Sequence, residues 1–373
     1  MSYNIPFIRP ELPTPEEMVE DYQNIVESNW FTNFGPYEKQ LSKEVTEYVG
    51  NNIFATTVAN CTLGLDIAIS LLFDATKSQV LVPAFTFAAG PEMLIRNGFK
   101  PLFLDIEQET WQMSLGQAED ILNKDSSDIA GILLCNTFGV GNPKISEWEA
   151  LAKKYDKKII IDTAAGFGSK YSQDEIVGAR GDCEIFSLHA TKPFAVGEGG
   201  IITSKNDTFI KEARSLMNFG FESDRTVHRI GTNAKMQEIN CAIGVRQLGK
   251  LKVRVEKRQQ LLAIYKEQLE DYGFVFQAND HLSTIAFVST LVPTGNNADT
   301  LQQVLIDSSV EARRYYTPAL HLHKAIMNES SIASNLEFTE EVSSRIISLP
   351  LLNDMSEVNI IEICKTLTGA LKV

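Results

Sequence analysis

The sequence predicts an α/β protein: a large domain with a mostly parallel sheet flanked by helices, followed by a smaller C-terminal α+β domain. Three observations lead to this fold class. The 373 residues suffice for about two domains. Short apolar strand candidates alternate with amphipathic helical patterns over about the first 250 residues. A long helical pattern without proline, roughly Met236 to Tyr272, then leads into the rest of the chain.

The first 250 residues contain the candidate elements of the large sheet. The expected strands are Ile53–Val58, Gln79–Val82, Lys100–Leu104, Ile129–Cys135, Lys158–Ile161, Cys183–Leu188 and Gly200–Ser204. Helices are expected between them, for example at Leu63–Phe73, Ala88–Asn97 and Ile145–Tyr155. Ligands of such sheets gather outside the carboxyl ends of the strands. Polar residues that follow these strands are therefore the candidate site.

The C-terminal part is predicted to form its own smaller domain. We expect the boundary near Lys250, which gives domains of residues 1–250 and 251–373. Strand candidates in the second part are Phe274–Gln277 and Thr284–Ser289, and its tail has helical spacing.

Composition excludes several classes of function. There are 34 basic and 48 acidic residues, a net charge of −14, which disfavours binding to nucleic acid or to anionic lipid. The five cysteines are widely spaced and form no CxxC pair, so we expect no metal site. No basic start followed by an apolar run is present, and no stretch approaches the ~18 apolar residues of a membrane span. We expect a reduced, cytoplasmic protein.

Asp162 stands where the apolar run Lys158–Ile161 gives way to small residues. A desolvated carboxylate needs a hydrogen-bonded or cationic partner, and a protonated heterocyclic nitrogen is one such partner. Taken alone, this segment favours a helix N-cap or a loop salt bridge.

Lys192 lies in a loop between a strand and the glycines of Gly197-Glu198-Gly199-Gly200. A single loop lysine is usually solvated. A lysine at a strand end can instead be desolvated, which lowers its pKa toward nucleophilic use and Schiff-base formation.

The segment Ala59–Asp66 follows a strand and opens a helix, where free backbone N–H groups and a hydroxyl can bind phosphate. Helix capping by Asn60 or Thr62 explains the same residues. Phe85 and Phe87 are ordinarily core residues, although one of them can stack on a planar ring.

Together, the phosphate turn, the aromatic pair, the strand-end Asp and the loop Lys resemble the DegT-type (DegT/DnrJ/StrS) nucleotide-sugar aminotransferases. The resemblance extends over nearly the whole chain. It includes Ser28–Pro36, Gly231-Thr232-Asn233, Ala242–Leu248, Tyr316–His321 and Ser348-Leu349-Pro350. It implies the aspartate aminotransferase-like architecture of fold-type I pyridoxal phosphate enzymes.

The resemblance also implies roles for individual residues. Lys192 is the implied Schiff-base lysine, and Asp162 the implied partner of the pyridinium nitrogen. Phe87 would stack on the ring. The phosphate would be held by Thr62, the Leu63 backbone, Ser187 and Asn233 of a neighbouring subunit, which implies a homodimer with shared active sites. His189, Arg229 and His321 are candidates for substrate contact, although His189 can merely orient its loop and His321 can merely pack.

The implied activity is transfer of an amino group from glutamate to a nucleoside-diphosphate-linked keto sugar, through the pyridoxamine phosphate form of the cofactor. The pattern around Ser187–Lys192 resembles 4-keto more than 3-keto enzymes, and the product would serve a surface polysaccharide such as lipopolysaccharide O-antigen or a glycosylated metabolite. Retained Lys192 favours amino transfer over a sugar dehydratase, and intact Lys192 and Asp162 disfavour a non-catalytic regulatory homologue. One departure is Ala165, where relatives often carry Gln or His near the cofactor's phenolic oxygen.

Overall fold

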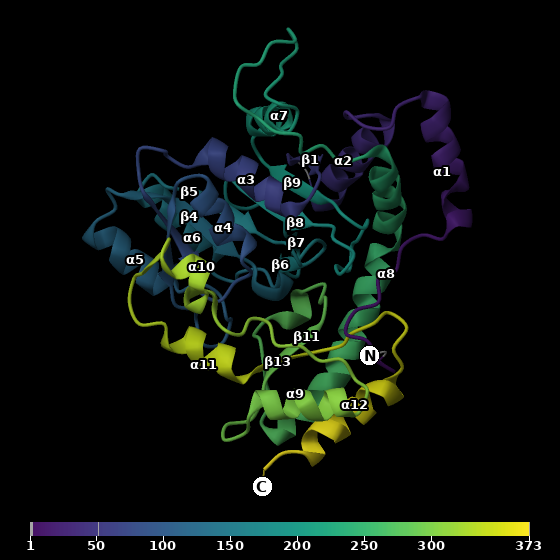
Figure 1. Cartoon of the computed structure of the whole chain (residues 1–373), viewed down its shortest axis with the longest axis vertical. Helices are drawn as coiled ribbons and strands as arrows, with labels where there is room; N and C mark the ends of the chain where they lie inside the picture. Colours follow the sequence, from purple (N-terminus) through teal and green to yellow (C-terminus); the bar gives the residue numbers. More distant parts are fainter. Residues whose placement is uncertain (1–2, 51, 373) are drawn as a thin grey trace.

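The computed structural model describes residues 3–50 and 52–372. Its centre is an eight-stranded sheet in the order β1-β9-β8-β5-β4-β2-β3-β12 (Figure 1). The strands are β1 (Phe54–Val58), β2 (Gln79–Pro83), β3 (Lys100–Leu104), β4 (Ile129–Cys135), β5 (Lys158–Asp162), β8 (Cys183–Ser187), β9 (Gly200–Ser204) and β12 (Ser331–Ile332). The pairs from β8 to β12 are parallel, and β9 runs antiparallel to both of its neighbours. The predicted mostly parallel sheet is confirmed.

Helices cover both faces of this sheet. The helices of the first part are α1 (Pro15–Ser28), α2 (Pro36–Val49), α3 (Cys61–Leu72), α4 (Ala89–Arg96), α5 (Leu115–Lys124), α6 (Ile145–Lys154) and α7 (Asp207–Leu216). Ile160 of β5 belongs to the core cluster with α3, α4 and α7, whereas Ile159 and Ile161 belong to the cluster with α2, α5 and α6. Successive strand side chains point to opposite faces, so this apolar run seals the sheet on both sides.

All seven strands expected in the first part are present, and each predicted boundary lies within one residue of the observed one. Of the helices expected as examples, α4 begins one residue later than predicted and α3 begins two residues earlier. The helix predicted at Leu63 starts at Cys61, because Asn60 caps it by accepting the Leu63 amide at 2.9 Å. A small two-stranded sheet, β6 (Lys170–Ser172) with β7 (Glu175–Ile176), was not predicted.

The long helix α8 runs continuously over Glu238–Leu269 and ends in the 3₁₀ turn η2 (Glu270–Tyr272). Beyond it lies a three-stranded antiparallel sheet, β10 (Val275–Phe276), β11 (Val288–Leu291) and β13 (Ile346–Leu349). Its core includes α9 (Ala298–Asp307) and α12 (Glu357–Gly369). The remaining short elements are η1 (Thr137–Gly139), η3 (Asp280–Leu282), η4 (Leu320–Leu322), α10 (Lys324–Met327) and α11 (Glu337–Arg345).

The strand predicted at Thr284–Ser289 was placed too early, since β11 begins only at Val288. Thr284 is instead held to the first part of the chain. Its amide donates to the Ser169 hydroxyl at 2.9 Å, and its hydroxyl donates to the Ala165 carbonyl at 3.0 Å. The boundary near Lys250 stays a prediction: Lys250 lies inside α8, and β12 from the C-terminal part joins the large sheet beside β3.

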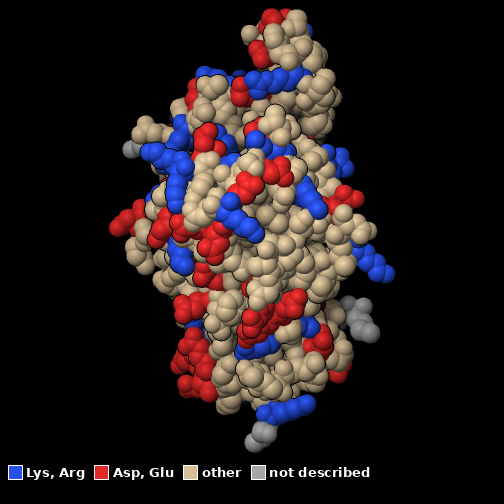
Figure 2. Space-filling view, turned by 90° about the vertical axis from the view of Figure 1, so that its left-hand side faces the viewer, with Lys and Arg blue, Asp and Glu red and all other residues tan. Residues whose placement is uncertain are grey.

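Among the described residues, no helix has both the length and the apolar character that crossing a bilayer requires. The face of the molecule in Figure 2 carries Lys and Arg interspersed with Asp and Glu, and acidic side chains gather toward its lower left. On this face the two signs of charge are mixed, and neither covers it alone.

Candidate active site

The candidate residues meet where the parallel strands end. Asp162 is the last residue of β5 and lies opposite Cys135, the last residue of β4. On its other side it pairs with Ile185 of β8, the strand that ends at Ser187. This is the edge at which α/β sheets bind ligands.

Asp162 is a buried carboxylate with an incomplete set of partners. Its Oδ1 accepts the Ala164 amide at 3.0 Å and lies 4.0 Å from the Cys61 sulfur. Within the described residues no Lys, Arg or His reaches it at ion-pair distance. Burial raises the pKa of Asp162 to about 6, although the Ala164 amide and the Lys192 charge act in the other direction. A cationic partner from a bound ligand would complete the site.

Lys192 lies in the loop between β8 and β9. Two backbone hydrogen bonds across the loop, from Ala190 to Gly197 and from Val196 to Leu188, close it into a hairpin. The Lys192 amide donates to the His189 carbonyl at 2.9 Å. Desolvation of the ammonium group lowers the pKa of Lys192, while the nearby Cys61 and Asp162 raise it. Lowering the pKa increases the fraction of neutral amine, the form that attacks a carbonyl and accepts a proton.

The predicted phosphate turn lies at the start of α3, and only part of it is available. The Leu63 amide already donates to Asn60, so the expected Leu63 contact is occupied by the helix cap. Within the described chain, neither the amide nor the hydroxyl of Thr62 has a hydrogen-bond partner. Gly200 of β9 packs against this turn, where a Cβ would come within 2.9 Å of the backbone of Asn60 and Cys61. Glycine is therefore needed for strand and turn to approach this closely.

Of the two candidate aromatics, Phe85 is fully buried and Phe87 is 59% exposed. The Phe87 ring lies 6.3 Å from the ring of Tyr316, which itself packs on Phe85 and Phe138. An exposed ring braced from one side has a face free for a planar ligand.

Ser187 and His189 organise the start of the Lys192 loop. The Ser187 hydroxyl accepts the His189 amide at 3.2 Å, and His189 Nδ1 lies 2.9 Å from the Thr191 hydroxyl. His189 Nε2 lies 3.6 Å from Glu198. Among the described residues, His189 thus makes its polar contacts only with residues of its own loop, as expected if it orients the loop.

Asn233 and Arg229 belong to a different part of the molecule. Residues 219–230 form an arm that projects beyond α7 at the top of Figure 1. Arg229 is on this arm and forms a 2.6 Å ion pair with Glu212 of α7. Asn233 lies exposed at its base, paired with Asn218. The carbonyl of the next residue, Ala234, accepts the Ala59 amide at 2.7 Å. The arm base thus adjoins the segment that leads into the phosphate turn of its own chain.

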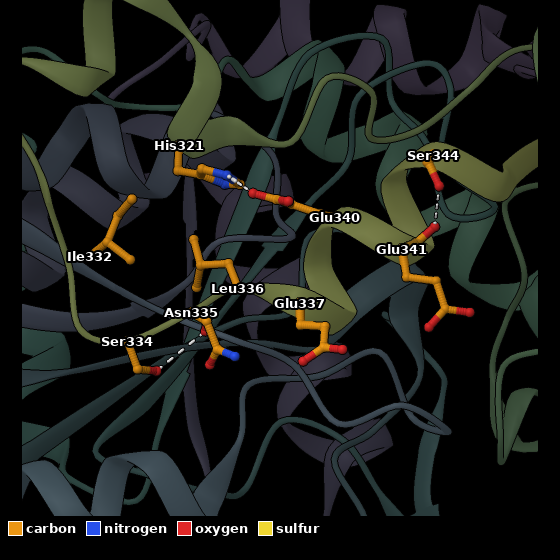
Figure 3. Close-up of a pocket in the computed structure, with 9 residues that line it drawn as sticks. All are labelled: His321, Ile332, Ser334, Asn335, Leu336, Glu337, Glu340, Glu341 and Ser344. Carbon is orange, nitrogen blue, oxygen red and sulfur yellow. Dashed lines mark hydrogen bonds and ion pairs between the residues drawn. The ribbon is translucent and has the colours of Figure 1, made fainter.

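His321 lies in η4 and lines a cavity of about 680 Å³ formed mainly by α11 and the segment before it (Figure 3). Its Nε2 faces Glu340 at 3.3 Å, and its buried Nδ1 has no partner among the described residues. Glu337 and Glu341 also line this cavity. Three carboxylates repel a nucleoside diphosphate, so this cavity does not suit the charged part of such a substrate.

Three residues that the sequence analysis did not single out also contribute to the edge. Cys135 was treated only as a thiol, and Tyr316 only as part of a motif. Glu184 of β8 is buried, accepts the Gly178 amide at 2.7 Å and the Thr163 hydroxyl at 3.0 Å, and has its pKa raised by burial to about 7. Its position inside the otherwise apolar strand Cys183–Ser187 could have identified Glu184 from the sequence as a buried carboxylate. Through Thr163, Glu184 supports the segment that follows Asp162.

These features together fit a ligand with a basic ring nitrogen, a carbonyl group and a phosphate. Asp162 is a buried acceptor in need of a cation, Lys192 is an amine of lowered pKa, and Thr62 offers unpaired donors at a helix N-terminus.

Comparison with known proteins points the same way. The model of the DegT/DnrJ/EryC1/StrS aminotransferase family matches residues 14–368. Protein Rv3402c of Mycobacterium tuberculosis is 40% identical over 94% of this chain and 86% of its own length. The dTDP-4-amino-4,6-dideoxy-D-glucose transaminase of Shigella dysenteriae is 28% identical over 93% of this chain and 94% of its own.

Two solved structures are similar over the full fold. A Bacillus cereus protein assigned to the PLP-dependent aminotransferases has a TM-score of 0.93 and 31% identity, over 98% of this chain and 99% of its own. DesI, solved with its TDP-sugar product, has a TM-score of 0.87 and 26% identity, over 97% of this chain and 91% of its own.

Proposed function

This chain belongs to the DegT/DnrJ/EryC1/StrS aminotransferase family and has the fold-type I architecture of pyridoxal phosphate enzymes, and from that premise we propose its substrates and site residues. The proposed reaction moves an amino group from glutamate to a nucleoside-diphosphate-linked 4-keto-6-deoxy sugar. The observation that carries the proposal is the pair at the sheet edge, Lys192 with lowered pKa beside the buried, incompletely paired Asp162.

The residues of this edge match the parts of pyridoxal phosphate. Asp162 would pair with the ring nitrogen, Phe87 would cover the ring, and Lys192 would hold the cofactor covalently. Thr62 and Ser187 would take the phosphate together with Asn233. The Leu63 amide joins them only if it exchanges its bond to Asn60, so Thr62 is the stronger donor.

The bound cofactor supplies the group that carries the amine and the ring that accepts an electron pair. The Lys192 amine would take the proton from the donor's α carbon as general base. It returns a proton as general acid in the opposite half-reaction, at the sugar carbon that receives the amine. Asp162, as a carboxylate, keeps the ring nitrogen protonated. Its own pKa falls when that cation is bound, because an opposite charge favours the ionised form.

The names of two relatives support the sugar class. One is a transaminase of dTDP-4-amino-4,6-dideoxy-D-glucose, and DesI has a TDP-sugar product. We therefore favour amination at C4 over a 3-keto substrate. Retained Lys192 favours transamination over a sugar dehydratase, and the intact pair of Lys192 and Asp162 favours turnover over a regulatory role. The amino sugar would enter a surface polysaccharide, such as O-antigen, or a glycosylated metabolite.

We further propose a homodimer with shared sites. On the arm, Ile230 is 95% exposed, and Phe221 and Val227 are also exposed. Apolar side chains clustered on a projecting hairpin are typical of a surface that another protein covers. A second copy seated on the arm would bring Asn233 toward the neighbour's phosphate turn. The five cysteines are free thiols, which suits the reducing cytoplasm that we propose as its location.

A direct assay tests the reaction. Purified protein with pyridoxal phosphate is incubated with glutamate and a panel of nucleotide-linked 4-keto and 3-keto sugars, and 2-oxoglutarate is measured. We expect 2-oxoglutarate and an amino sugar in equal amounts with a 4-keto-6-deoxy sugar. Release of 2-oxoglutarate with 3-keto sugars alone would contradict C4 amination. Loss of water from the sugar without 2-oxoglutarate would identify a dehydratase, and no conversion of any sugar would contradict the proposed substrate class. Lys192→Ala serves as the control.

A further inference from the structure

The loop that carries Lys192 is held from outside by the long helix α8. Arg254 Nη1 donates to the Pro193 carbonyl at 2.9 Å, and Gln247 Nε2 donates to the Ala195 carbonyl at 3.2 Å. Pro193 directly follows Lys192 in the chain. Within the described residues neither carbonyl accepts a backbone hydrogen bond of the loop, so α8 supplies hydrogen bonds that the loop does not make itself.

The two α8 side chains also hold each other. Arg254 Nη2 donates to Gln247 Oε1 at 3.1 Å, and both side chains are buried. Residues seven apart on a helix lie on the same face, so a single ridge of α8 presents both donors to the loop. Between the two held carbonyls, the Phe194 ring packs on the Phe167 ring at 4.8 Å. The three residues after Lys192 are therefore fixed in succession.

The N-terminal segment closes this cluster from the other side. The Glu11 carboxylate lies 3.5 Å from Arg254, and the Glu11 carbonyl accepts Gln247 Nε2 at 2.6 Å. Glu11 also accepts a hydrogen bond from Asn353 in the C-terminal part. The cavity left between Lys192 and these residues measures only about 10 Å³, room for little more than one water molecule.

Helix α8 contains a second buried arginine, Arg258, whose hydrogen-bond partners differ from those of Arg254. Arg258, one turn later, donates to the carbonyls of Ile285 and Leu351 and to Asn353. Arg254 and Arg258 have the same exposed fraction, 7%. Of these two arginines, only Arg254 bonds to the Lys192 loop. Replacing each in turn therefore distinguishes an effect on Lys192 from a general effect on the packing of α8.

Resting on the proposed function, we infer that Arg254 and Gln247 are positioning residues for Lys192. By holding the Pro193 and Ala195 carbonyls, they set the direction from which the Lys192 amine reaches the carbon that gains or loses a proton. A small misplacement of a catalytic group slows the chemical step strongly, while ground-state binding changes little.

The test compares Arg254→Met with Arg258→Met in the full-length protein loaded with pyridoxal phosphate. For Arg254→Met we expect kcat to fall about tenfold with KM for both substrates within about twofold. The induced circular dichroism of the visible cofactor band should change in shape or sign, because it reports the orientation of the cofactor against the Lys192 loop. Arg258→Met should keep the wild-type circular dichroism, whatever it does to the melting temperature.

Gln247→Met keeps the inference testable if Arg254→Met does not fold, because it removes the Ala195 bond while Arg254 keeps its bond to the Pro193 carbonyl. It should change kcat and circular dichroism in the same direction, by a smaller factor. Lys250 is also on α8 and forms an exposed ion pair with Glu17 of α1, so Lys250→Met is the surface control.

Wild-type kcat and circular dichroism in folded Arg254→Met or Gln247→Met would overturn the inference. Equal changes in Arg254→Met and Arg258→Met would overturn it too, since both would then act through packing of α8. Borohydride reduction of the wild type separates this failure from failure of the proposed function: if the wild type fixes no cofactor on Lys192, the proposed function itself is wrong.

Discussion

The sheet edge around Asp162 and the arm of residues 219–230 differ in almost every physical respect. At the edge, charged groups are buried among parallel strands, and burial shifts the pKa of Asp162 upward and that of Lys192 downward. On the arm, apolar side chains are exposed, and the charged residues form solvent-facing pairs such as Arg229 with Glu212. The edge thus keeps charged groups away from water, and the arm exposes apolar side chains to it.

The difference shows what each region lacks within one chain. A buried carboxylate without a cation calls for a bound partner of opposite charge. An apolar hairpin in water calls for another surface. The two sides of the arm lie close together at its base: Gly220 has φ +74°, and a Cβ there would meet the Arg229 carbonyl oxygen at 1.8 Å. These two features are the basis for our proposals that a ligand completes the edge and that a second copy of the chain covers the arm.

The strongest test of the edge is Lys192→Ala. We expect loss of transamination by at least about 10³-fold and loss of covalent cofactor attachment, with the fold retained, because the Lys192 amine of lowered pKa is gone from the edge. Activity and borohydride fixation of the cofactor are measured together. A variant that still fixes cofactor would place the anchor on another lysine.

Asp162→Asn should leave cofactor bound but slow transamination by about 10²-fold, because a neutral amide does not keep the ring nitrogen protonated. Single-turnover rates with glutamate measure this step without product release. Rates near those of the wild type would remove Asp162 from this role.

Asp162→Asn should also stabilise the cofactor-free protein, because the buried carboxylate at the edge, unlike the solvent-facing charges of the arm, has no cationic partner among the described residues. The pKa of Asp162 is about 6 in the folded state and near 3.9 in the unfolded state. Between these pH values the folded state binds more protons than the unfolded state, so the Asp162 carboxyl increasingly destabilises the folded protein as the pH rises. Asp162→Asn should raise the free energy of unfolding by up to about 2–3 kcal/mol at pH 7 and by little at pH 4. Denaturant titrations of apoprotein at both values measure it. A gain independent of pH would point to packing instead.

Subunit mixing tests whether the arm completes a neighbour's site. Lys192→Ala subunits are mixed with Asn233→Asp subunits, whose new carboxylate should repel the cofactor phosphate. Random reassociation makes half of the dimers mixed, each with one intact site of two, so activity should recover to about a quarter of the wild type. After subunit exchange has been verified, recovery no greater than the sum of the separate variants would assign Asn233 to its own chain, where Ala234 already contacts Ala59.

The smallest effect is expected on the arm surface, from Arg229→Ala. Its ion pair with Glu212 is exposed, and such pairs contribute about 0–1 kcal/mol. We expect the melting temperature to change little and KM for the nucleotide sugar to stay within about twofold. A KM increase of tenfold or more, with melting unchanged, would instead make Arg229 a substrate contact.

Much of the fold was determined by the sequence alone, for a local reason. Short apolar runs such as Ile159–Ile161, alternating with helical patterns, predict strands buried on both faces, and in the structure helices pack on both sides of them. Asp162 and Lys192 became candidates because each follows such a run, and parallel strands bring their carboxyl ends to one edge. Their proposed roles came from the family resemblance, since each segment alone also fits a helix cap or a solvated side chain.

What depends on contacts between distant segments was decided only by the tertiary structure. The sequence does not show that Thr284 would bond to Ser169 and delay β11, or that Asn60 would take the Leu63 amide. Nor does it show that Arg254 would reach the carbonyl after Lys192 across sixty-one positions of chain. Strand patterns are set by neighbours two residues apart, whereas these hydrogen bonds exist only once the large sheet, α8 and the N-terminal segment have packed together.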